Sequence, residues 1–135
     1  MYTKLFVEIQ MKVKPTSSEL EILQILWKNG ESTVREVNEE LSRERDTEVG
    51  YTTTLKLMQI MHEKGLVERD TSNRTHRYKA LISKEDTSQG ILQTMIDTVF
   101  NGSAAQLVMQ ALSNKTSSKE EIKKIKEYLD QLEKK

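Results

Sequence analysis

The sequence predicts a mainly α-helical fold with one small β-hairpin: an N-terminal domain of three helices and the hairpin, followed by an all-helical domain. Apolar residues recur at helical spacing in six segments, and this period changes to short, charged segments around residues 66–81. With 31% charged and 36% hydrophobic residues, the 135-residue chain has the composition of a globular protein. The expected domain bounds are 12–82 and 83–135, preceded by a distinct segment at 1–11.

Residues 1–11 differ in pattern from the rest of the chain. Leu5, Val7 and Ile9 alternate with other residues in the period of two that is typical of a β-strand, so the segment is read as an added edge strand. Met11 offers a second natural start for the chain, so the alternative reading is an N-terminal extension. The sequence leaves both readings open.

Two helices with N-terminal capping boxes follow Pro15. Thr16 and Glu19 have the required spacing of three residues, and the first helix is expected to end at Asn29-Gly30, where the glycine accepts the left-handed conformation. Thr33 and Glu36 repeat the box for a second helix, which is expected to run to about residue 43. Apolar residues give each helix an inward face: Leu20, Ile22, Leu23, Leu26 and Trp27 in the first, and Val34, Val37 and Leu41 in the second.

The third helix, between Gly50 and Gly65, has an unusual first turn. One face carries the residues expected to point into the core. The opposite face carries hydroxyl groups and a lysine in the first turn, where acidic residues usually lie. Unpaired backbone N–H groups at a helix start favour phosphate, so the segment is predicted to be a DNA recognition helix. Its expected inner residues are Thr54, Leu57, Met58 and Met61, and its expected DNA-binding residues are Tyr51, Thr52, Thr53 and Lys56.

A β-hairpin is predicted directly after this helix, because residues 66–70 and 76–81 flank a Thr/Ser/Asn turn. Three helices and such a hairpin describe a winged helix-turn-helix domain. Arg74 at the tip and Arg77 are expected to reach the DNA backbone or an adjacent minor groove. Thr33 and Arg35 open the second helix, which crosses the backbone in this architecture, and they complete the predicted DNA-binding set.

The C-terminal half is predicted to be three helices with narrow apolar stripes. They are separated by Asn101-Gly102-Ser103 and by a polar break at residues 114–118. About fifty residues with such stripes bury little surface alone, so this domain is expected to complete its core against a second copy of the chain. The expected dimerisation residues are Ile91, Met95, Leu107, Ile122, Ile125, Leu129 and Leu132.

The charge distribution supports the DNA interpretation better than the total charge does. The chain has 21 basic and 21 acidic residues, so its formal net charge is zero. Residues 51–80, however, carry six cations against three acids, whereas residues 16–50 carry four cations against nine acids. The zero total keeps open a winged helix that serves as a protein-interaction module, and a pocket in the second half would make the chain an effector-sensing regulator.

Other classes of function lack the residues that they need. Cysteine is absent, and the isolated His62 and His76 have no companion at ligand spacing, so neither a metal site nor a cofactor is expected. No nucleophile–base pair or phosphate-binding glycine loop occurs, so the chain is not expected to be an enzyme. No apolar run approaches the roughly 18 residues of a membrane span, and we expect a cytoplasmic protein without membrane insertion.

Three stretches together resemble the penicillinase repressor family (BlaI/MecI type, with the copper-responsive CopY repressors as a branch). They are the run from Glu21 to Trp27, the pattern from Tyr51 to Leu55 that leads to Lys64-Gly65-Leu66-Val67, and the hairpin from Arg74 to Tyr78. The likeness covers residues 12–81 well and the helical tail in layout only. It implies a homodimeric transcriptional repressor of antibiotic-resistance genes that binds a palindromic operator in double-stranded DNA.

The resemblance also implies how repression ends. In the family, a membrane sensor-protease signal leads to cleavage of the dimerisation domain, and the corresponding region of this chain lies near Phe100 and Asn101. The copper-responsive branch has a cysteine-rich C-terminal motif that this chain lacks, so copper sensing is not expected.

Overall fold

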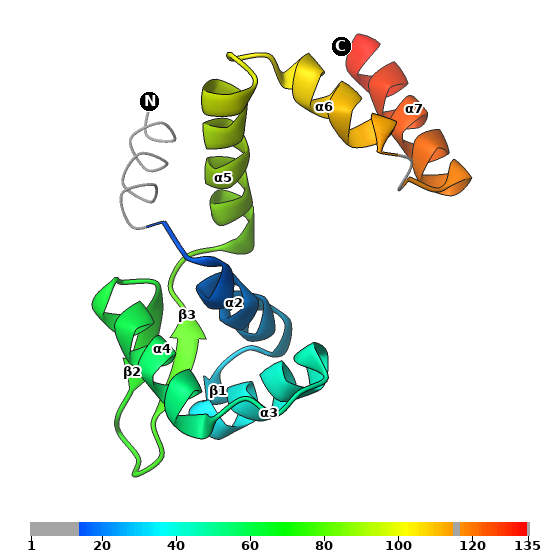
Figure 1. The fold of residues 1–135 in the computed structure, drawn as a ribbon. Helices are drawn as coiled ribbons and strands as arrows, with labels where there is room; N and C mark the ends of the chain where they lie inside the picture. The colour runs from blue at the N-terminus through cyan, green and yellow to red at the C-terminus, as the bar shows by residue number, and fades with distance from the viewer. Residues whose placement is uncertain (1–13, 115–116, 135) are drawn as a thin grey trace. The chain divides into compact units, whose positions relative to one another are not determined.

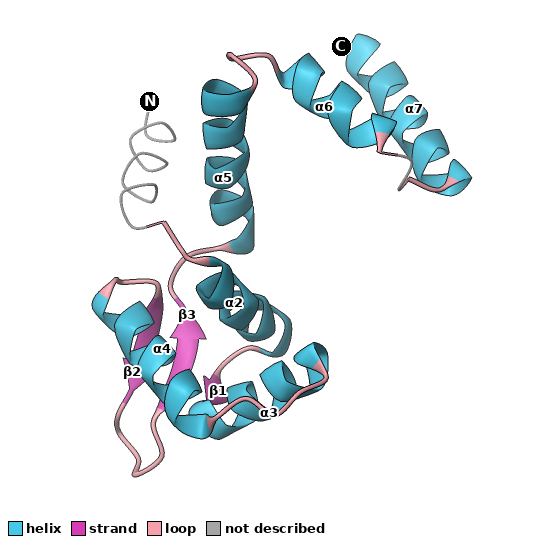
Figure 2. Ribbon diagram, viewed as in Figure 1, coloured by secondary structure: helices cyan, strands magenta, loops and turns pink. Residues whose placement is uncertain are grey.

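The computed structural model describes residues 14–114 and 117–134, and the chain divides into two compact units, with the boundary between Ile91 and Leu92 (Figures 1 and 2). The fold is mainly helical with one small sheet, as predicted. The segment at 1–11, with its alternative readings, lies outside the described residues. The elements are α2 (Ser17–Asn29), β1 (Ser32–Thr33), α3 (Val34–Arg45), α4 (Tyr51–Glu63), β2 (Val67–Asp70), β3 (Arg77–Ala80), α5 (Lys84–Val99), α6 (Ala104–Ser113) and α7 (Lys119–Glu133).

Both predicted capping boxes are formed. The hydroxyl of Thr16 accepts the Glu19 N–H at 3.2 Å, and the Glu19 carboxylate accepts the Thr16 N–H at 2.8 Å. Thr33 and Glu36 make the same pair of bonds at 3.2 and 2.8 Å. Gly30 ends α2 with a φ of 79°, a conformation that costs glycine little because it has no side chain. The local signals therefore fix where α2 and α3 begin.

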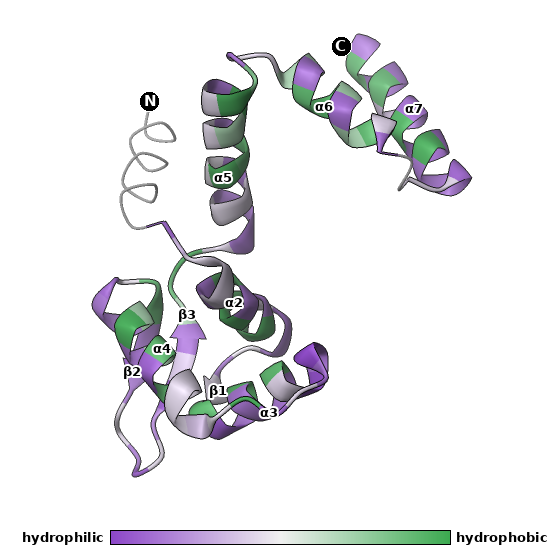
Figure 3. Ribbon diagram, in the orientation of Figure 1, coloured by the Kyte–Doolittle hydropathy of each residue, from purple (hydrophilic) through white to green (hydrophobic). Residues whose placement is uncertain are grey.

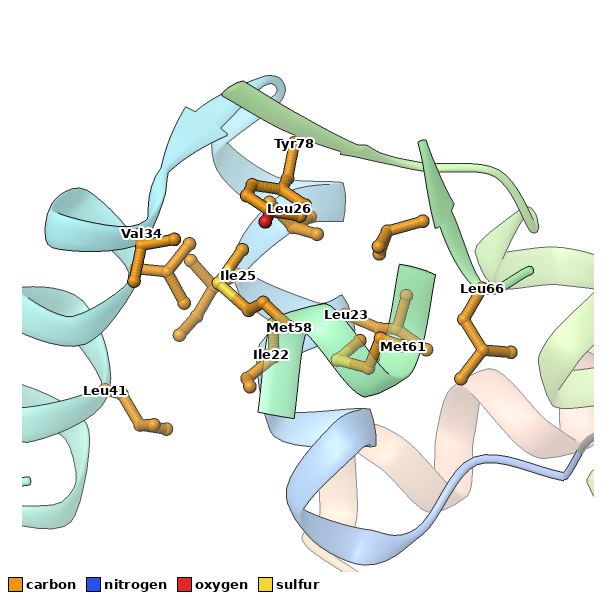
Figure 4. Close-up of a cluster of buried hydrophobic side chains, with 12 residues drawn as sticks. Ile22, Leu23, Ile25, Leu26, Val34, Leu41, Met58, Met61, Leu66 and Tyr78 are labelled. Atoms are coloured by element: carbon orange, nitrogen blue, oxygen red, sulfur yellow. The ribbon is translucent and has the colours of Figure 1, made fainter. Parts of the chain in front are cut away.

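The first unit has one hydrophobic core, built mainly from α2, α3, α4 and the sheet (Figure 4). Met58 and Met61 of α4 are fully buried in it, together with Thr54. Leu57, which the helical period predicts on the same inner face, is only partly buried at the edge of the core. The buried apolar residues are Ile22, Leu23, Ile25, Leu26, Val34, Val37, Leu41, Met58, Met61, Leu66, Val67 and Tyr78.

The sheet has three antiparallel strands in the order β1-β3-β2, one more than the predicted hairpin. The added strand is the two-residue β1, in which Ser32 lies opposite Tyr78 and Thr33 opposite Arg77. Two residues are too few to show a period, so this strand has no local signal in the sequence. The pairing of β1 with β3 therefore joins the residues just before α3 to the hairpin.

The second unit contains the end of α5 together with α6 and α7. Ser103 and Ser118 cap the last two helices by accepting the backbone N–H of Gln106 and Glu121. Each helix is amphipathic, with green apolar and purple polar bands in Figure 3, yet no side chain of α6 or α7 is buried. Among the described residues, no helix has the length and apolar character to cross a membrane.

Candidate nucleic-acid interface

Among the described helices of the first unit, α4 is the one whose start no side chain caps. Gly50 occupies the N-cap position and offers no side-chain acceptor, and the first turn has no acidic residue. Tyr51, Thr52, Thr53 and Lys56 are all exposed around this turn, and Tyr51 retains 49% of its accessible surface. Backbone donors, hydroxyl groups and a cation therefore face solvent together, which is the chemistry that binds phosphate and base edges.

Partly buried hydrogen bonds on the inner side of the helix hold the start of α4 in place. The side-chain amide of Asn38 on α3 donates to the carbonyl oxygen of Val49 and to the hydroxyl of Thr54, both at 2.9 Å. The Val49 N–H in turn donates to the hydroxyl of Ser42 at 3.1 Å. Because Thr54 is fully buried, these bonds fix the loop before α4 and the first turn of the helix relative to α3.

The other end of α4 is held by an ion pair. Lys64, at the C-cap, donates to both carboxylate oxygens of Glu19 at 2.9 and 3.0 Å, and Glu19 is 1% exposed. Burial opposes ionisation of Glu19, but the hydrogen bonds from Thr16 and Lys64 and the charge of Lys64 outweigh it. They hold the pKa of this carboxyl below its ordinary value.

This ion pair predicts an acid-sensitive contribution to stability. A carboxyl whose folded pKa is depressed stabilises the fold above its unfolded pKa, and the contribution is lost as the pH falls through the folded pKa. Glu19→Gln is therefore expected to lower the free energy of unfolding at pH 7 by about 1–3 kcal/mol. Urea denaturation measures the free energy of unfolding, and the difference between the variant and the unmodified protein is expected to shrink as the pH falls through the folded pKa of Glu19. A difference that stays the same over this fall in pH, or an equal loss in Glu63→Gln on the exposed face of α4, would contradict this role.

A groove of about 360 Å³ lies between the start of α3, the first turns of α4 and the hairpin. Three arginines and one histidine line it, and no carboxylate of the described residues does. This is notable in a chain whose formal charge is zero, because it concentrates positive potential beside the exposed start of α4. We call it the arginine groove; it is lined by Thr33, Val34, Arg35, Tyr51, Leu55, Gln59, Arg69, Arg74, Thr75, His76 and Tyr78.

The arginine groove brings together four of the predicted DNA-binding residues: Thr33, Arg35, Tyr51 and Arg74. Thr52, Thr53 and Lys56 are exposed on α4 but do not line the groove. Sequence reasoning missed the groove residues Gln59, Arg69, Thr75 and His76. The charged residues of this strand were expected to point outward, and Arg69 was included among them. Its position two residues after Val67 was the available signal, because alternate residues of a strand share one face and Val67 is buried.

Arg77 lies apart from this set. Its guanidinium pairs with the Glu31 carboxylate at 3.2 Å and donates to the Glu31 carbonyl oxygen at 3.1 Å, and Glu36 lies 3.8 Å away. It lines a second depression, of about 430 Å³, together with Glu31, Glu68 and Asp70, and Arg69 lines this depression as well as the arginine groove. The structure therefore engages Arg77 within the protein, on a surface of mixed charge.

The predicted dimerisation residues are incompletely covered. In the second unit, Leu129 is 51% and Leu132 48% exposed, and Met95 is 42% exposed. Leu107, Ile122 and Ile125 are half-buried, as is Ile91 at the end of the first unit. Such an amount of exposed apolar surface on amphipathic helices is typical of a surface that binds another protein.

The turn between α5 and α6 contains the predicted cleavage region. Phe100 is half-buried, and Asn101 is exposed with a φ of 50°, followed by Gly102 with a φ of 82°. Among the residues that the structure describes, no group of three metal-ligating side chains occurs.

Comparison with known proteins decides the family. The sequence model described as penicillinase repressor matches residues 15–131, which is most of the chain. The chain belongs to the penicillinase repressor family. This membership confirms the resemblance seen in the sequence, and the family is one of transcriptional repressors and not of enzymes.

Two curated relatives match this chain over almost their whole length, and a third matches over about half of its length. The methicillin resistance regulatory protein MecI of Mammaliicoccus sciuri is 24% identical over 115 residues, which cover 85% of this chain and 92% of MecI. The penicillinase repressor of Bacillus licheniformis is 25% identical over 117 residues, or 86% and 89% of the two chains. The transcriptional regulator BlaI of Mycobacterium tuberculosis matches a shorter stretch and is 33% identical over 75 residues, or 55% and 53%.

Solved structures support the fold. The complex structures of hsRosR-S4 and hsRosR-SG superpose with TM-scores of 0.52 and 0.51 at 13% and 14% identity. They cover 79% and 86% of this chain and 94% and 89% of the solved chains. At such identity the likeness concerns the fold alone, and it confirms the fold predicted from the sequence.

Proposed function

We propose that the protein is a cytoplasmic, homodimeric repressor that binds a palindromic operator through α4 and the hairpin. Residues 12–82 form the DNA-binding domain of this repressor, and residues 83–135 form the dimerisation domain. The observation that carries the proposal is the arginine groove, with no carboxylate among its described lining residues, beside the uncapped, hydroxyl-rich start of α4. Family membership supports a DNA-binding regulator over a winged helix used only for protein contacts.

In the proposed complex, α4 enters the major groove. Lys56 binds guanine acceptors, while Tyr51, Thr52 and Thr53 bind phosphates or base edges. The hairpin acts as the wing, and Arg74 at its exposed tip binds the backbone or the adjacent minor groove. Thr33 and Arg35 bind the backbone from the start of α3. Arg77, which pairs with Glu31, is proposed as a further contact to the backbone or the adjacent minor groove.

A dimer is proposed because the second unit leaves its apolar stripes uncovered. Two-fold symmetry then requires an operator whose half-sites lie about 34–36 Å apart or a multiple of that distance. Ile91, Met95, Leu107, Ile122, Ile125, Leu129 and Leu132 are the proposed contacts between the two copies.

Relief of repression is proposed to follow cleavage in the turn after α5, near Phe100 and Asn101, in response to a membrane sensor-protease system. Cleavage there would release α6 and α7 from the DNA-binding domain and remove the avidity of the dimer. Immunoblots of induced cells are expected to show two fragments, and extracts are expected to lose operator binding. Full derepression with only intact protein would exclude this mechanism.

The proposal is tested with a duplex that the wild-type protein selects from a random pool, which we call the operator. Arg74→Ala is expected to weaken binding to the operator and to a scrambled duplex by a similar factor of about five, because a wing-tip arginine contacts backbone. Fluorescence anisotropy measures both affinities. Arg43→Ala, an exposed arginine of α3 that pairs with Glu40, is the control and is expected to change neither. Equal affinities for Arg74→Ala and the wild type would refute the assignment of the wing.

A further inference from the structure

The connector between the sheet and α5 consists of three residues, and each of them is held by a hydrogen bond. The Leu81 N–H donates to the carbonyl oxygen of Leu66 at 3.0 Å, which extends the hairpin. The carbonyl oxygen of Ile82 accepts the indole N–H of Trp27 on α2 at 2.9 Å. The hydroxyl of Ser83 accepts a backbone N–H of the first turn of α5 at 3.0 Å. The connector is therefore an ordered part of the first unit and not a flexible linker.

Trp27 supplies the hydrogen bond that joins this connector to α2. It lies 55 residues before Ile82 in the chain, and both side chains are partly buried against the hydrophobic core. The other two bonds are made within the hairpin and within the start of α5. An indole N–H that leaves water needs an acceptor, and the Ile82 carbonyl oxygen satisfies it. Trp27 therefore holds the connector in a fixed place beside α2.

The helix that begins at this anchored connector also enters the second unit. α5 runs without a break from Lys84 to Val99, and the boundary between the two units falls inside it, after Ile91. Its buried residues, Thr87 and Gly90, both precede that boundary. The chain therefore passes from the first unit to the second through a helix and not through a loop. A stiff link restricts the separations that two tethered sites can span, whereas a flexible link tolerates many.

Resting on the homodimeric repressor proposed above, we propose that Trp27 is a positioning residue for operator spacing. Its bond to Ile82 fixes the start of α5 on the DNA-binding domain, and α5 leads to the surface through which the two copies associate. The bond thus limits the separation and rotation at which the two DNA-binding domains of a dimer meet their half-sites. Trp27 is not among the residues that line the arginine groove, so this role is separate from contact with DNA.

The spacing preference of operator binding tests this role by fluorescence anisotropy. Two base pairs inserted between the half-sites rotate one half-site by about 70° relative to the other and move it about 7 Å away. We expect the wild-type protein to bind this spaced operator about a hundredfold more weakly, because the gain of linked binding is lost. Trp27→Phe keeps an aromatic ring but loses the N–H, and we expect its penalty to be only about twentyfold, a difference that corresponds to one hydrogen bond. Its affinity for a duplex with a single half-site is expected to match that of the wild type.

Two further proteins control for folding. Glu21→Gln disrupts the hydrogen bonds from Arg45 to α2, at 2.9 and 3.0 Å, without touching the connector, and we expect it to keep the full spacing penalty. Because the chain has a single tryptophan, growth of a tryptophan auxotroph on benzothienylalanine replaces Trp27 alone and exchanges its indole N–H for sulfur. This protein keeps the shape of the side chain, so it is expected to behave as Trp27→Phe does, and it decides the question if Trp27→Phe does not fold.

The possible outcomes separate this role from the proposed function. If the benzothienylalanine protein keeps the full spacing penalty, or if Glu21→Gln reduces the penalty equally, the inference is overturned. It is also overturned if the loss of the N–H weakens binding to a single half-site as much as binding to the operator, because the change then acts within the DNA-binding domain. A wild-type protein that binds paired half-sites no more tightly than one half-site would instead overturn the proposed dimeric repressor.

Discussion

Replacing Leu129 with glutamate is expected to weaken operator binding about hundredfold, the largest effect of any change considered. Leu129 lies on the apolar stripe of α7 and is 51% exposed in the isolated chain. A charge there would be buried and unpaired in the dimer, so the copies would separate. Each half-site would then be bound by an independent monomer, and linked binding gains a factor of about 10²–10⁴ over such monomers.

Two measurements check this prediction. Analytical ultracentrifugation is expected to show a dimer for the wild type and a monomer for Leu129→Glu, and anisotropy is expected to show the loss of affinity. Gln131→Glu places the same new charge on the opposite, exposed side of α7, and it is expected to change neither result. A Leu129→Glu protein that remains dimeric would show that the stripe of α7 is not the interface.

Replacing Lys56 with alanine is expected to weaken operator binding about tenfold while weakening binding to scrambled duplex about threefold or less. Lys56 is exposed on the outer face of α4, two positions after the buried Thr54. A side chain that bonds a base edge contributes about 1–3 kcal/mol of discrimination against the wrong base, whereas a phosphate contact contributes to all sequences alike. The ratio of operator to scrambled affinity is therefore the quantity that separates base recognition from general charge.

Lys28→Ala provides the control for this comparison. Lys28 is an exposed lysine near the end of α2 with Glu40 3.9 Å away, and it lines no part of the arginine groove. Its removal is expected to lower both affinities slightly and to leave their ratio unchanged. If Lys56→Ala lowers both affinities by the same factor, Lys56 contacts only the backbone.

The helices could be predicted because their signals are local. Thr16 with Glu19, and Thr33 with Glu36, mark the helix starts by residue type and spacing alone, and both boxes are formed. Gly65, with a φ of 80°, lets the Leu66 N–H return to the Met61 carbonyl oxygen at 2.9 Å and thus ends α4 where the sequence indicated.

The parts that could not be predicted depend on contacts between distant residues. The strand β1 exists only because Ser32 and Thr33 pair with residues more than forty positions later. Arg77 is engaged by Glu31, which is equally distant in sequence, so its paired state has no local sign.

Guanine-N7 methylation interference on the operator tests most directly whether the start of α4 reads the major groove. Two groups of guanines related by two-fold symmetry, one or two helical turns apart, are expected to block binding when they are methylated at N7. In Lys56→Ala, at least one guanine of each group is expected to lose this interference. If methylation at no guanine interferes, the proposed role of α4 as the recognition helix is contradicted; if the pattern is the same with Lys56→Ala, the proposed base contact of Lys56 is contradicted.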